Sequence, residues 1–478
     1  MTPRRTAFLA AVGAFAAFLP ALSNGFVLDD VYYVVLNPVV AAPGRWWTFW
    51  TTPTALLADA NLAGQVWRPL AGHWFGLLAW GLGKNPFWFH LGAALLHAVS
   101  TALVALLAAS LAGPAAALPA AVLFALHPAQ AEAVAYAGNT PGLLAGAGVL
   151  LALLLHEGGR RRTAVAVGAA ALLCRESAAV LPFLIWAWDR CRSPKVSLSR
   201  EAGEGWGEGI PPHPALSPTG ERENGLTDRP RGWVPHAGVL AAFAVARTLV
   251  LGAVAQRSLW GGSWPVHLKL SLQGLGMGLG HVVWPAGLRV CYSFSEAGGL
   301  VPAATAALGL AALAWGALCG LRARRPWAFG LCFGLASLIP VSNLVPIDAL
   351  AADRFLYMPL AGLALTLGAA ASAWTPLRRG AASAALTLAF LPALLSAQVP
   401  WQDNFTLDLA AYAAAPEDPC APLNLSAHYF NWGMLGRARA LAVLASADAA
   451  PSHVREEARR RVGLCDAVSA ARTRGRAP

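Results

Sequence analysis

Long runs of apolar residues set the strongest limit on how this chain folds. A bilayer core is about 30 Å thick, and a helix needs about 20 mostly apolar residues to cross it. The runs 7–22 and 87–111 contain no charged residue. Of the 478 residues, 57% are hydrophobic and 12% are charged, whereas soluble proteins carry about 25% charged residues. These features exclude a soluble enzyme and predict an all-α polytopic membrane protein.

Arginine clusters between the apolar runs orient the chain. The net charge of +11 would indicate nucleic acid in a soluble protein, but short clusters that flank apolar runs mark cytoplasmic loops instead. Such clusters lie at 4–5, 160–162, 322–325 and 378–379. We expect a multi-pass protein of the cell inner (plasma) membrane, with about eleven transmembrane helices, a cytoplasmic N-terminus and an extracytoplasmic C-terminus. The expected spans are 7–22, 87–111, one between 114 and 127, 143–155, 164–173, 178–188, 234–254, 301–321, 328–339, 355–371 and 382–395.

Two apolar runs have rival interpretations. The first could be a cleaved signal peptide, since Ala21-Leu22-Ser23 is small enough for cleavage. We favour an anchored helix, because a functional motif follows it at once. The run 267–284 could span the membrane, but it would then place the cluster 322–325 outside. We therefore interpret it as an interfacial or re-entrant helix.

The chain divides into four regions by composition. An N-terminal membrane region, 1–196, contains a Trp-rich first outer loop at 23–86, as expected for a segment at the membrane interface. Residues 197–231 are Gly-, Pro- and Glu-rich, which predicts a disordered cytoplasmic insert without function. A second membrane region, 232–400, follows it. The polar tail 401–478 is predicted to be an extracytoplasmic helical segment.

Two features of the tail can be interpreted further. Residues 431–451 resemble one degenerate tetratricopeptide unit, although three or more units are normally needed to bury their faces. The seven cysteines form no CxxC pair and no cluster with zinc spacing. Cys420 and Cys465 could pair if the tail lies outside the cytoplasm. The sequence predicts no metal site and requires no cofactor, and a divalent cation remains an open alternative.

The segment NGFVLDD, residues 24–30, places two adjacent carboxylates just beyond the first span. Acidic groups near a membrane surface are costly to desolvate and are usually functional. Asp29 or Asp30 could act as general base on an acceptor hydroxyl or bind a cation. The competing interpretation is a helix cap with a solvated acid.

Arginines at outer ends of spans are candidate phosphate ligands. Arg68 follows the interfacial loop and Arg354 precedes a span. Arginine binds phosphate through two parallel hydrogen bonds, but either residue could instead be a snorkelling side chain. Arg175 and Glu176 form a third candidate, with an intramembrane salt bridge as the alternative.

A short outer loop holds two further candidates, His127 and Glu132. They could bind a metal or the acceptor. A capping role for the His127-Pro128 pair is the alternative.

Six segments in order resemble a known family. They read NGFVLDD (24–30), WRPL (67–70), NPFWFHLGAALLHA (85–98), LFALHPAQAEAVAY (123–136), LLCRESAAVLP (172–182) and DRFLYMPLAGL (353–363). The set resembles the membrane domain of transmembrane and tetratricopeptide repeat-containing O-mannosyltransferase-like proteins, in the GT-C superfamily. The resemblance implies a polyprenyl-phosphate sugar donor and a carboxylate role for Asp29 or Asp30.

The chain departs from this family at three places. Residues 138–144 read GNTPGLL, where the family usually shows Gly-Arg-x-Asp-Leu-Leu. A common Asp-Tyr is Cys291-Tyr292 here, and the repeat array is reduced to one unit.

The leading hypothesis is a GT-C-type glycosyltransferase that acts on a hydroxyl of a protein or glycan. Asp29 or Asp30 would remove the hydroxyl proton, and Arg354 or Arg68 would steady the departing phosphate. The alternatives are a polytopic transporter or flippase and a catalytically inactive GT-C-like scaffold. A transporter places ionisable residues near the bilayer midplane. An enzyme is expected to gather Asp29, Arg68 and Glu132, together with Arg354, in one outer cavity.

Overall fold

The protein is an assembly of helices. The computed structural model describes residues 2–52, 55–56, 66–191, 232–252, 259–290, 292, 294, 300–347, 349–447, 450 and 452–474. Within these residues the regular elements are helices and no strand occurs, which confirms the all-α prediction. The predicted insert, 197–231, lies outside the described residues.

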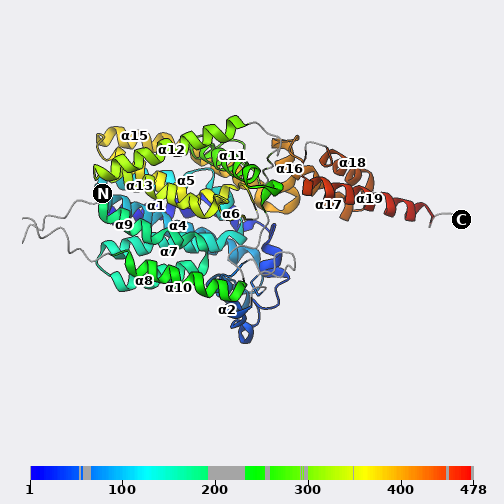
Figure 1. The fold of residues 1–478 in the computed structure, drawn as a ribbon, viewed down its shortest axis with the longest axis horizontal. Coiled ribbons are helices and arrows are strands. Elements are labelled where there is room, and N and C mark those ends of the chain that lie inside the picture. The colour runs from blue at the N-terminus through cyan, green and yellow to red at the C-terminus, as the bar shows by residue number, and fades with distance from the viewer. Residues whose placement is uncertain are drawn as a thin grey trace, which may run out of the picture.

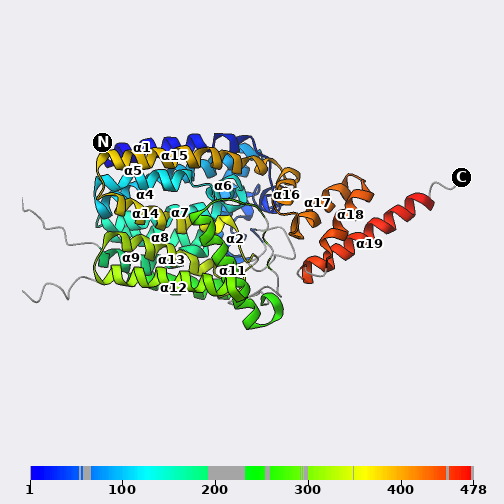
Figure 2. The ribbon, with the colours of Figure 1, turned by 90° about the horizontal axis from the view of Figure 1, so that it is seen from above.

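One bundle of roughly parallel and antiparallel helices forms the larger part of the molecule (Figures 1 and 2). The N-terminus lies at one end of this bundle and the tail extends from the other. The bundle helices are α1 (Pro3–Ala17), α4 (Pro86–Ala112), α5 (Ala117–Leu126), α7 (Thr140–Glu157), α8 (Arg161–Cys174), α9 (Leu181–Cys191), α10 (Val234–Leu251), α12 (Leu300–Arg322), α13 (Pro326–Leu338), α14 (Tyr357–Ala371) and α15 (Pro376–Gln398).

Six helical stretches of the described chain are long and apolar enough to cross a membrane. They are Pro86–Ala112, Ala137–Glu157, Val234–Leu251, Leu300–Arg322, Asp353–Ala371 and Pro376–Gln402. Two shorter apolar stretches, Pro114–Leu126 and Pro326–Val341, add to them. The protein is therefore a polytopic membrane protein, and the count of eleven spans stays a prediction.

Local sequence explains where the longest helix begins and ends. The side-chain oxygen of Asn85 accepts a hydrogen bond from the Phe87 N–H at 3.0 Å, and Pro86 opens the helix. Proline suits the first turn because its missing N–H has no partner there. Gly113, at φ 88°, ends the helix in a conformation that other residues rarely adopt. The chain then reverses into α5.

Small residues allow α13 and α14 to pack closely. A side chain at Gly362 of α14 would collide with the backbone of Gly330 and Gly334 on α13. Membrane helices associate through such small residues, because lipid provides no hydrophobic drive for larger side chains to meet.

The remaining helices lie towards the end of the bundle opposite the N-terminus (Figures 1 and 2). The tail helices α16 to α19 project beyond that end, and α18 and α19 lie farthest from the bundle. These elements are α2 (Thr48–Thr51), α3 (Pro69–Leu82), α6 (Gln130–Ala135), α11 (Trp264–Val283), α16 (Asn404–Ala414), α17 (Cys420–Asn431), α18 (Leu435–Ala445) and α19 (Ser452–Arg474).

Helix α11 contains nearly all of the apolar run 267–284, for which the sequence favours an interfacial or re-entrant helix. His267 near its start contacts the Asn343 carbonyl oxygen at 2.7 Å. His281 near its end lies 2.8 Å from an Asp353 carboxylate oxygen. Both ends of α11 thus contact one connection, the stretch from α13 to α14. These contacts support the interfacial or re-entrant interpretation.

The predicted pairing of Cys420 with Cys465 is wrong. Cys420 is disulfide-bonded, whereas Cys465 is a buried free thiol. Cys465 lies within α19, far along the projecting tail, and its residue is 1% exposed. The spacing of the cysteines in the sequence could not show that Cys465 is buried where α19 packs against its neighbouring helices.

Candidate functional site

The acidic segment 24–30 is fixed by residues far along the chain. It follows the 3-10 helix η1 (Leu19–Ser23). The Gly25 N–H donates to the Gln402 carbonyl at 2.9 Å, and the Leu28 N–H donates to the Asn404 side-chain oxygen at 2.8 Å. Leu28 has a φ of 50°, which is uncommon for a residue with a side chain. The tail therefore holds the backbone that carries Asp29 and Asp30.

Asp30 is fully buried and faces backbone. Its carboxyl group accepts hydrogen bonds from the N–H groups of Val27, at 3.0 Å, and Gly138. Burial raises the pKa of Asp30 to about 8, because a charged carboxylate is disfavoured away from water. Asp30 thus joins the loop that follows η1 to the connection between α6 and α7.

Asp29 points to a different environment. It is only partly buried, and its Oδ2 accepts a hydrogen bond from the Tyr136 hydroxyl at 3.2 Å. The Tyr136 ring stacks on Trp401 with centroids 6.0 Å apart. The Arg354 guanidinium lies 5.8 Å from the same ring. Asp29 is therefore positioned by an aromatic side chain and lies near a cation.

Arg354 and Glu132 form an ion pair across the site. Arg354 comes from the 3-10 helix η9 (Asp353–Leu356) and Glu132 from α6. The guanidinium donates to Glu132 Oε1, and the Arg354 backbone N–H donates to Oε2 at 3.0 Å. Burial raises the pKa of Glu132, although Arg354 opposes that shift. The Glu132 carboxylate is thus engaged by Arg354. Binding of the acceptor substrate by Glu132 stays a prediction.

A second ion pair involves Glu176, at the start of the 3-10 helix η6 (Glu176–Val180). Arg68 Nε donates to Glu176 Oε2 at 2.9 Å, and Arg247 Nε lies 3.7 Å from Oε1. Burial by itself would raise the pKa of Glu176, but the neighbouring Arg68 and Arg247 outweigh it and lower the pKa. The salt bridge that was the alternative interpretation of Arg175 and Glu176 is thus not the one that forms, because Glu176 pairs with Arg68 and Arg247.

Arg175 instead contacts a neutral side chain. Its Nη1 donates to the Asn139 Oδ1 at 2.6 Å. Burial lowers the pKa of Arg175 to about 10, and the charges of Arg68 and Arg354 add to this effect. Arg175 therefore lies close enough to Arg68 and Arg354 to be repelled by both, and the attraction by Glu176 opposes this repulsion. Burial raises the pKa of the Tyr33 hydroxyl. The charges of the three arginines oppose this shift, and the charge of Asp29 adds to it.

His127 does not join this cluster. Its Nε2 lies 3.2 Å from the Val282 carbonyl, and its Nδ1 accepts the Ala129 N–H at 3.3 Å. The ring meets Phe390 edge-on, with centroids 5.0 Å apart. These contacts fit the capping interpretation of the His127-Pro128 pair.

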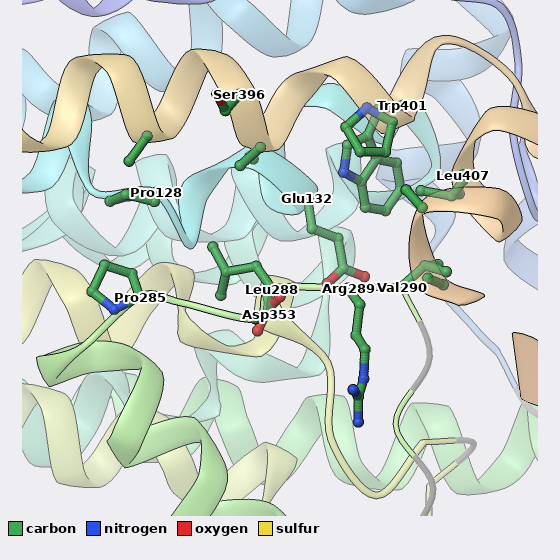
Figure 3. Close-up of a pocket in the computed structure, with 17 residues that line it drawn as sticks. Pro128, Glu132, Pro285, Leu288, Arg289, Val290, Asp353, Ser396, Trp401 and Leu407 are labelled. Atoms are coloured by element: carbon green, nitrogen blue, oxygen red, sulfur yellow. The ribbon is translucent and has the colours of Figure 1, made fainter. Parts of the chain in front are cut away.

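A cavity of about 240 Å³ adjoins the site (Figure 3). Glu132 and Trp401 contribute to its wall, so it lies beside the Tyr136–Asp29 contact. Most of the wall comes from small apolar residues of α15 and α16 and from the segment 285–290. Arg289 and Asp353 also line it, and in Figure 3 the Arg289 side chain points away from the Glu132 carboxylate.

Three contributors to the site were missed from the sequence. Tyr136 and Asn139 hold Asp29 and Arg175, and Arg247 of α10 pairs with Glu176. Tyr136 was within a recognised segment, but nothing in its spacing identified Asp29 as its partner. Among the described residues, no group of three His, Cys, Asp or Glu side chains could hold a metal ion.

Curated proteins match part of this chain. The protein O-mannosyl-transferase Tmtc2 of Drosophila melanogaster is 38% identical over 185 residues, covering 34% of this chain and 19% of that protein. Tmtc1 of the same organism is 35% identical over 178 residues, covering 34% and 20%. Human TMTC1 is 32% identical over 158 residues, covering 32% and 17%. This similarity supports the resemblance carried by the motifs.

The chain spans about a fifth of the length of the curated relatives it matches. No family model matches the chain, and no solved structure matches it.

Proposed function

We propose that this protein is a membrane glycosyltransferase that moves a sugar from a polyprenyl-phosphate carrier to a hydroxyl group at the outer membrane face. The observation that carries the proposal is the gathering of Asp29 with Arg68, Arg175 and Arg354 at one end of the helix bundle. One carboxylate that can take a proton thus lies among cations that can hold a phosphate. The relatives are named protein O-mannosyl-transferases, which favours a protein acceptor and mannose as the first sugar to test.

The chemistry requires one bond to form and one to break. The acceptor hydroxyl oxygen attacks the anomeric carbon of the sugar, and the bond from that carbon to the phosphate oxygen breaks. The bonding electron pair leaves with the phosphate, which becomes a lipid phosphate monoester. Asp29 takes the hydroxyl proton, since it is the more accessible acid and Tyr136 fixes its orientation.

Electrostatics favour the departure of the phosphate. Negative charge grows on its oxygens as the sugar leaves, and preorganised cations stabilise that charge in a site with little water. Arg68, Arg175 and Arg354 come from three separate connections of the chain. Arg354 and Arg68 are paired with Glu132 and Glu176, and Arg175 is the cation of the three for which a bound anion would relieve the repulsion most.

Two features support the proposed orientation in the membrane. Arginine clusters flank the ends of helices on the N-terminal side of the bundle, which the positive-inside rule assigns to the cytoplasm. Cys420 of the tail is disulfide-bonded, and disulfides persist in oxidising compartments outside the cytoplasm. Both favour an extracytoplasmic site and tail.

The geometry favours an enzyme over a transporter. A transporter places its ionisable groups near the middle of the membrane, between discontinuous helices. Here Asp29, Glu132 and Glu176, with their arginine partners, lie in connections at the tail end of the bundle. This placement suits surface chemistry on a lipid headgroup.

The test is sugar transfer by the purified full chain in lipid nanodiscs. A panel of polyprenyl-phosphate sugars, with polyprenyl-phosphate mannose first, is offered with Ser- and Thr-containing peptides. We expect at least one donor to support transfer by the wild type and none to support it in Asp29→Asn. Arg162→Gln, an exposed change at the opposite end, is the matched control and should transfer at the wild-type rate. A wild-type protein that transfers no sugar would favour the inactive scaffold.

A further inference from the structure

The arginines of the site are not equivalent, because their partners differ. Arg354 gives two hydrogen bonds to the Glu132 carboxylate, so its charge is compensated in place. Arg68 likewise donates to the Glu176 carboxylate at 2.9 Å. Arg175 donates to the Asn139 amide oxygen, which carries no charge. Within the part of the chain that the structure describes, no carboxylate forms an ion pair with Arg175.

A partly buried cation without an ion-pair partner is unfavourable. Arg175 is partly buried, and the repulsion by Arg68 and Arg354 acts on it more strongly than the attraction by the nearby Glu176 carboxylate. Buried charges in proteins are normally paired. A site that retains such a cation gains stability when an anion binds there, and the gain is largest where no carboxylate competes.

The guanidinium group of Arg175 occupies the space that a side chain at residue 142 would take. A Cβ atom added at Gly142 would lie 2.6 Å from Arg175 Nη1 and 2.8 Å from Asn139 Oδ1. Glycine therefore lets the guanidinium lie against the α7 backbone. The first turn of α7 contains no acidic residue, and the Asn139 side chain makes no cap hydrogen bond to it. The positive end of the helix dipole adds to the positive potential of the arginine.

We propose that Arg175, held by Asn139 against the bare backbone of Gly142, binds the phosphate group of the lipid donor, and that the compensated Arg354 does not. This inference rests on the proposed function and assigns its phosphate subsite. Arg354 then acts on Tyr136 and, through it, on the orientation of Asp29. The donor phosphate bears one negative charge as a diester and gains a second as the sugar leaves. Arg175 thus stabilises the product more strongly than the donor.

The test is binding of a C55 polyprenyl phosphate to the full chain in nanodiscs, with the matching polyprenol as the uncharged probe. Wild type should bind the phosphate more tightly than the alcohol. Arg175→Gln should weaken phosphate binding by about 10- to 100-fold, as expected for the loss of a hydrogen bond to a charged group. Binding of the polyprenol should not change. Arg175→Lys, which keeps the charge but loses the planar fork, should fall between the two.

A second variant adds charge without removing the arginine. Asn139→Asp places a carboxylate on the oxygen that already contacts Arg175, and it should weaken phosphate binding as Arg175→Gln does. The joint variant Glu132→Gln/Arg354→Gln removes an ion pair whose two charges cancel, and it should weaken phosphate binding less than Arg175→Gln does. Inorganic phosphate serves as a competitor. Competition by it would show that the subsite recognises the phosphate group itself.

The outcomes separate the two proposals. If wild type binds polyprenyl phosphate no better than polyprenol, the proposed donor class fails and this inference fails with it. If wild type prefers the phosphate and Arg175→Gln, eluting as a folded monodisperse protein, binds it equally well, the inference alone is overturned. A larger loss in the joint Glu132/Arg354 variant than in Arg175→Gln would also overturn it.

Discussion

The Tyr136 hydroxyl donates a hydrogen bond to Asp29 Oδ2 at 3.2 Å, while the adjacent Asp30 turns away into backbone N–H groups. Two neighbouring carboxylates therefore have different surroundings. Leu28, with its φ of 50°, sets the direction in which the two side chains separate. We infer a chemical role for the first acid and a structural role for the second.

Replacing Asp29 with Asn should remove the general base without disturbing the fold. We expect sugar transfer to fall by about 10²- to 10⁴-fold, the usual contribution of general acid–base catalysis. The side-chain oxygen of Asn can still accept from Tyr136, so the melting temperature should stay near that of wild type. Transfer at the wild-type rate would exclude Asp29 as the base.

Asp30 should make stability depend on pH. Its pKa is raised from 3.8 to about 8 in the folded protein, so the folded state holds the proton more tightly than the unfolded state. The stabilisation is complete below about pH 4 and is lost as the pH rises to about 8. We expect a lower melting temperature at pH 8 than at pH 5. Asp30→Asn cannot ionise and should show a smaller difference between the two conditions. An unchanged slope in that variant would assign the dependence to another group.

The Glu132–Arg354 pair should be strongly coupled. Glu132→Gln leaves Arg354 without its carboxylate, and breaking one side of a buried pair costs about 3–5 kcal/mol. The Arg354 side chain is 22% exposed, so we expect the lower end of that range. The joint variant Glu132→Gln/Arg354→Gln should lose less stability than the sum of the losses in the two single variants. Thermal melts of all four proteins form a double-mutant cycle, and strictly additive losses would contradict the coupling.

Gly362 should tolerate no larger residue. A side chain there meets the backbone of α13, and overpacking costs about 1–3 kcal/mol or more. Gly362→Val should lower the melting temperature and the yield of monodisperse protein. Gly309→Val on α12 is the matched control, because a side chain at that position meets nothing within 4 Å. Equal behaviour of the two variants would show that α13 and α14 are not packed as described.

Residues 197–231 should be removable. The chain on either side of them is already close together, since a Cβ at Gly232 would lie 3.4 Å from the Asp189 carboxylate. Five residues, 192–196, then suffice to join α9 to the start of α10. The deletion variant should express, insert and melt like wild type, as judged by fluorescence-detected size exclusion. Loss of folded protein would assign the segment a structural role.

The sequence predicted most of the helices because apolar runs of span length leave little choice of structure. It placed the start of α15 too late, at residue 382, since Arg378 and Arg379 seemed to belong to a loop. In the structure both lie in the first turn of α15, where the Thr375 side chain accepts from the Arg378 N–H. Long arginine side chains can extend from such a turn to the interface.

The site was predictable only in part. Asp29, Arg68 and Arg354 could be placed at the same end of the bundle, because position along the chain determines the end at which a connection lies; that this end faces outward stays a prediction. The sequence could not show which arginine pairs with which carboxylate, because Arg354 and Glu132 are separated by 222 positions. Pairings of this kind depend on how the helices pack, and local patterns carry no information about it.

The hydrogen bonds that join Leu28 to Asn404 and Gly25 to Gln402 also bear on how the protein is made. Leu28 leaves the ribosome 376 residues before Asn404. At a synthesis rate of about 5–20 residues per second, roughly 20 to 75 seconds pass between the synthesis of the acidic loop and that of its hydrogen-bond partners. Helix α15 must also be inserted before residues 402–404 reach the loop. The segment that carries Asp29 therefore gains these contacts only after α15 has been made, so a chain stalled before α15 carries Asp29 without a fixed position.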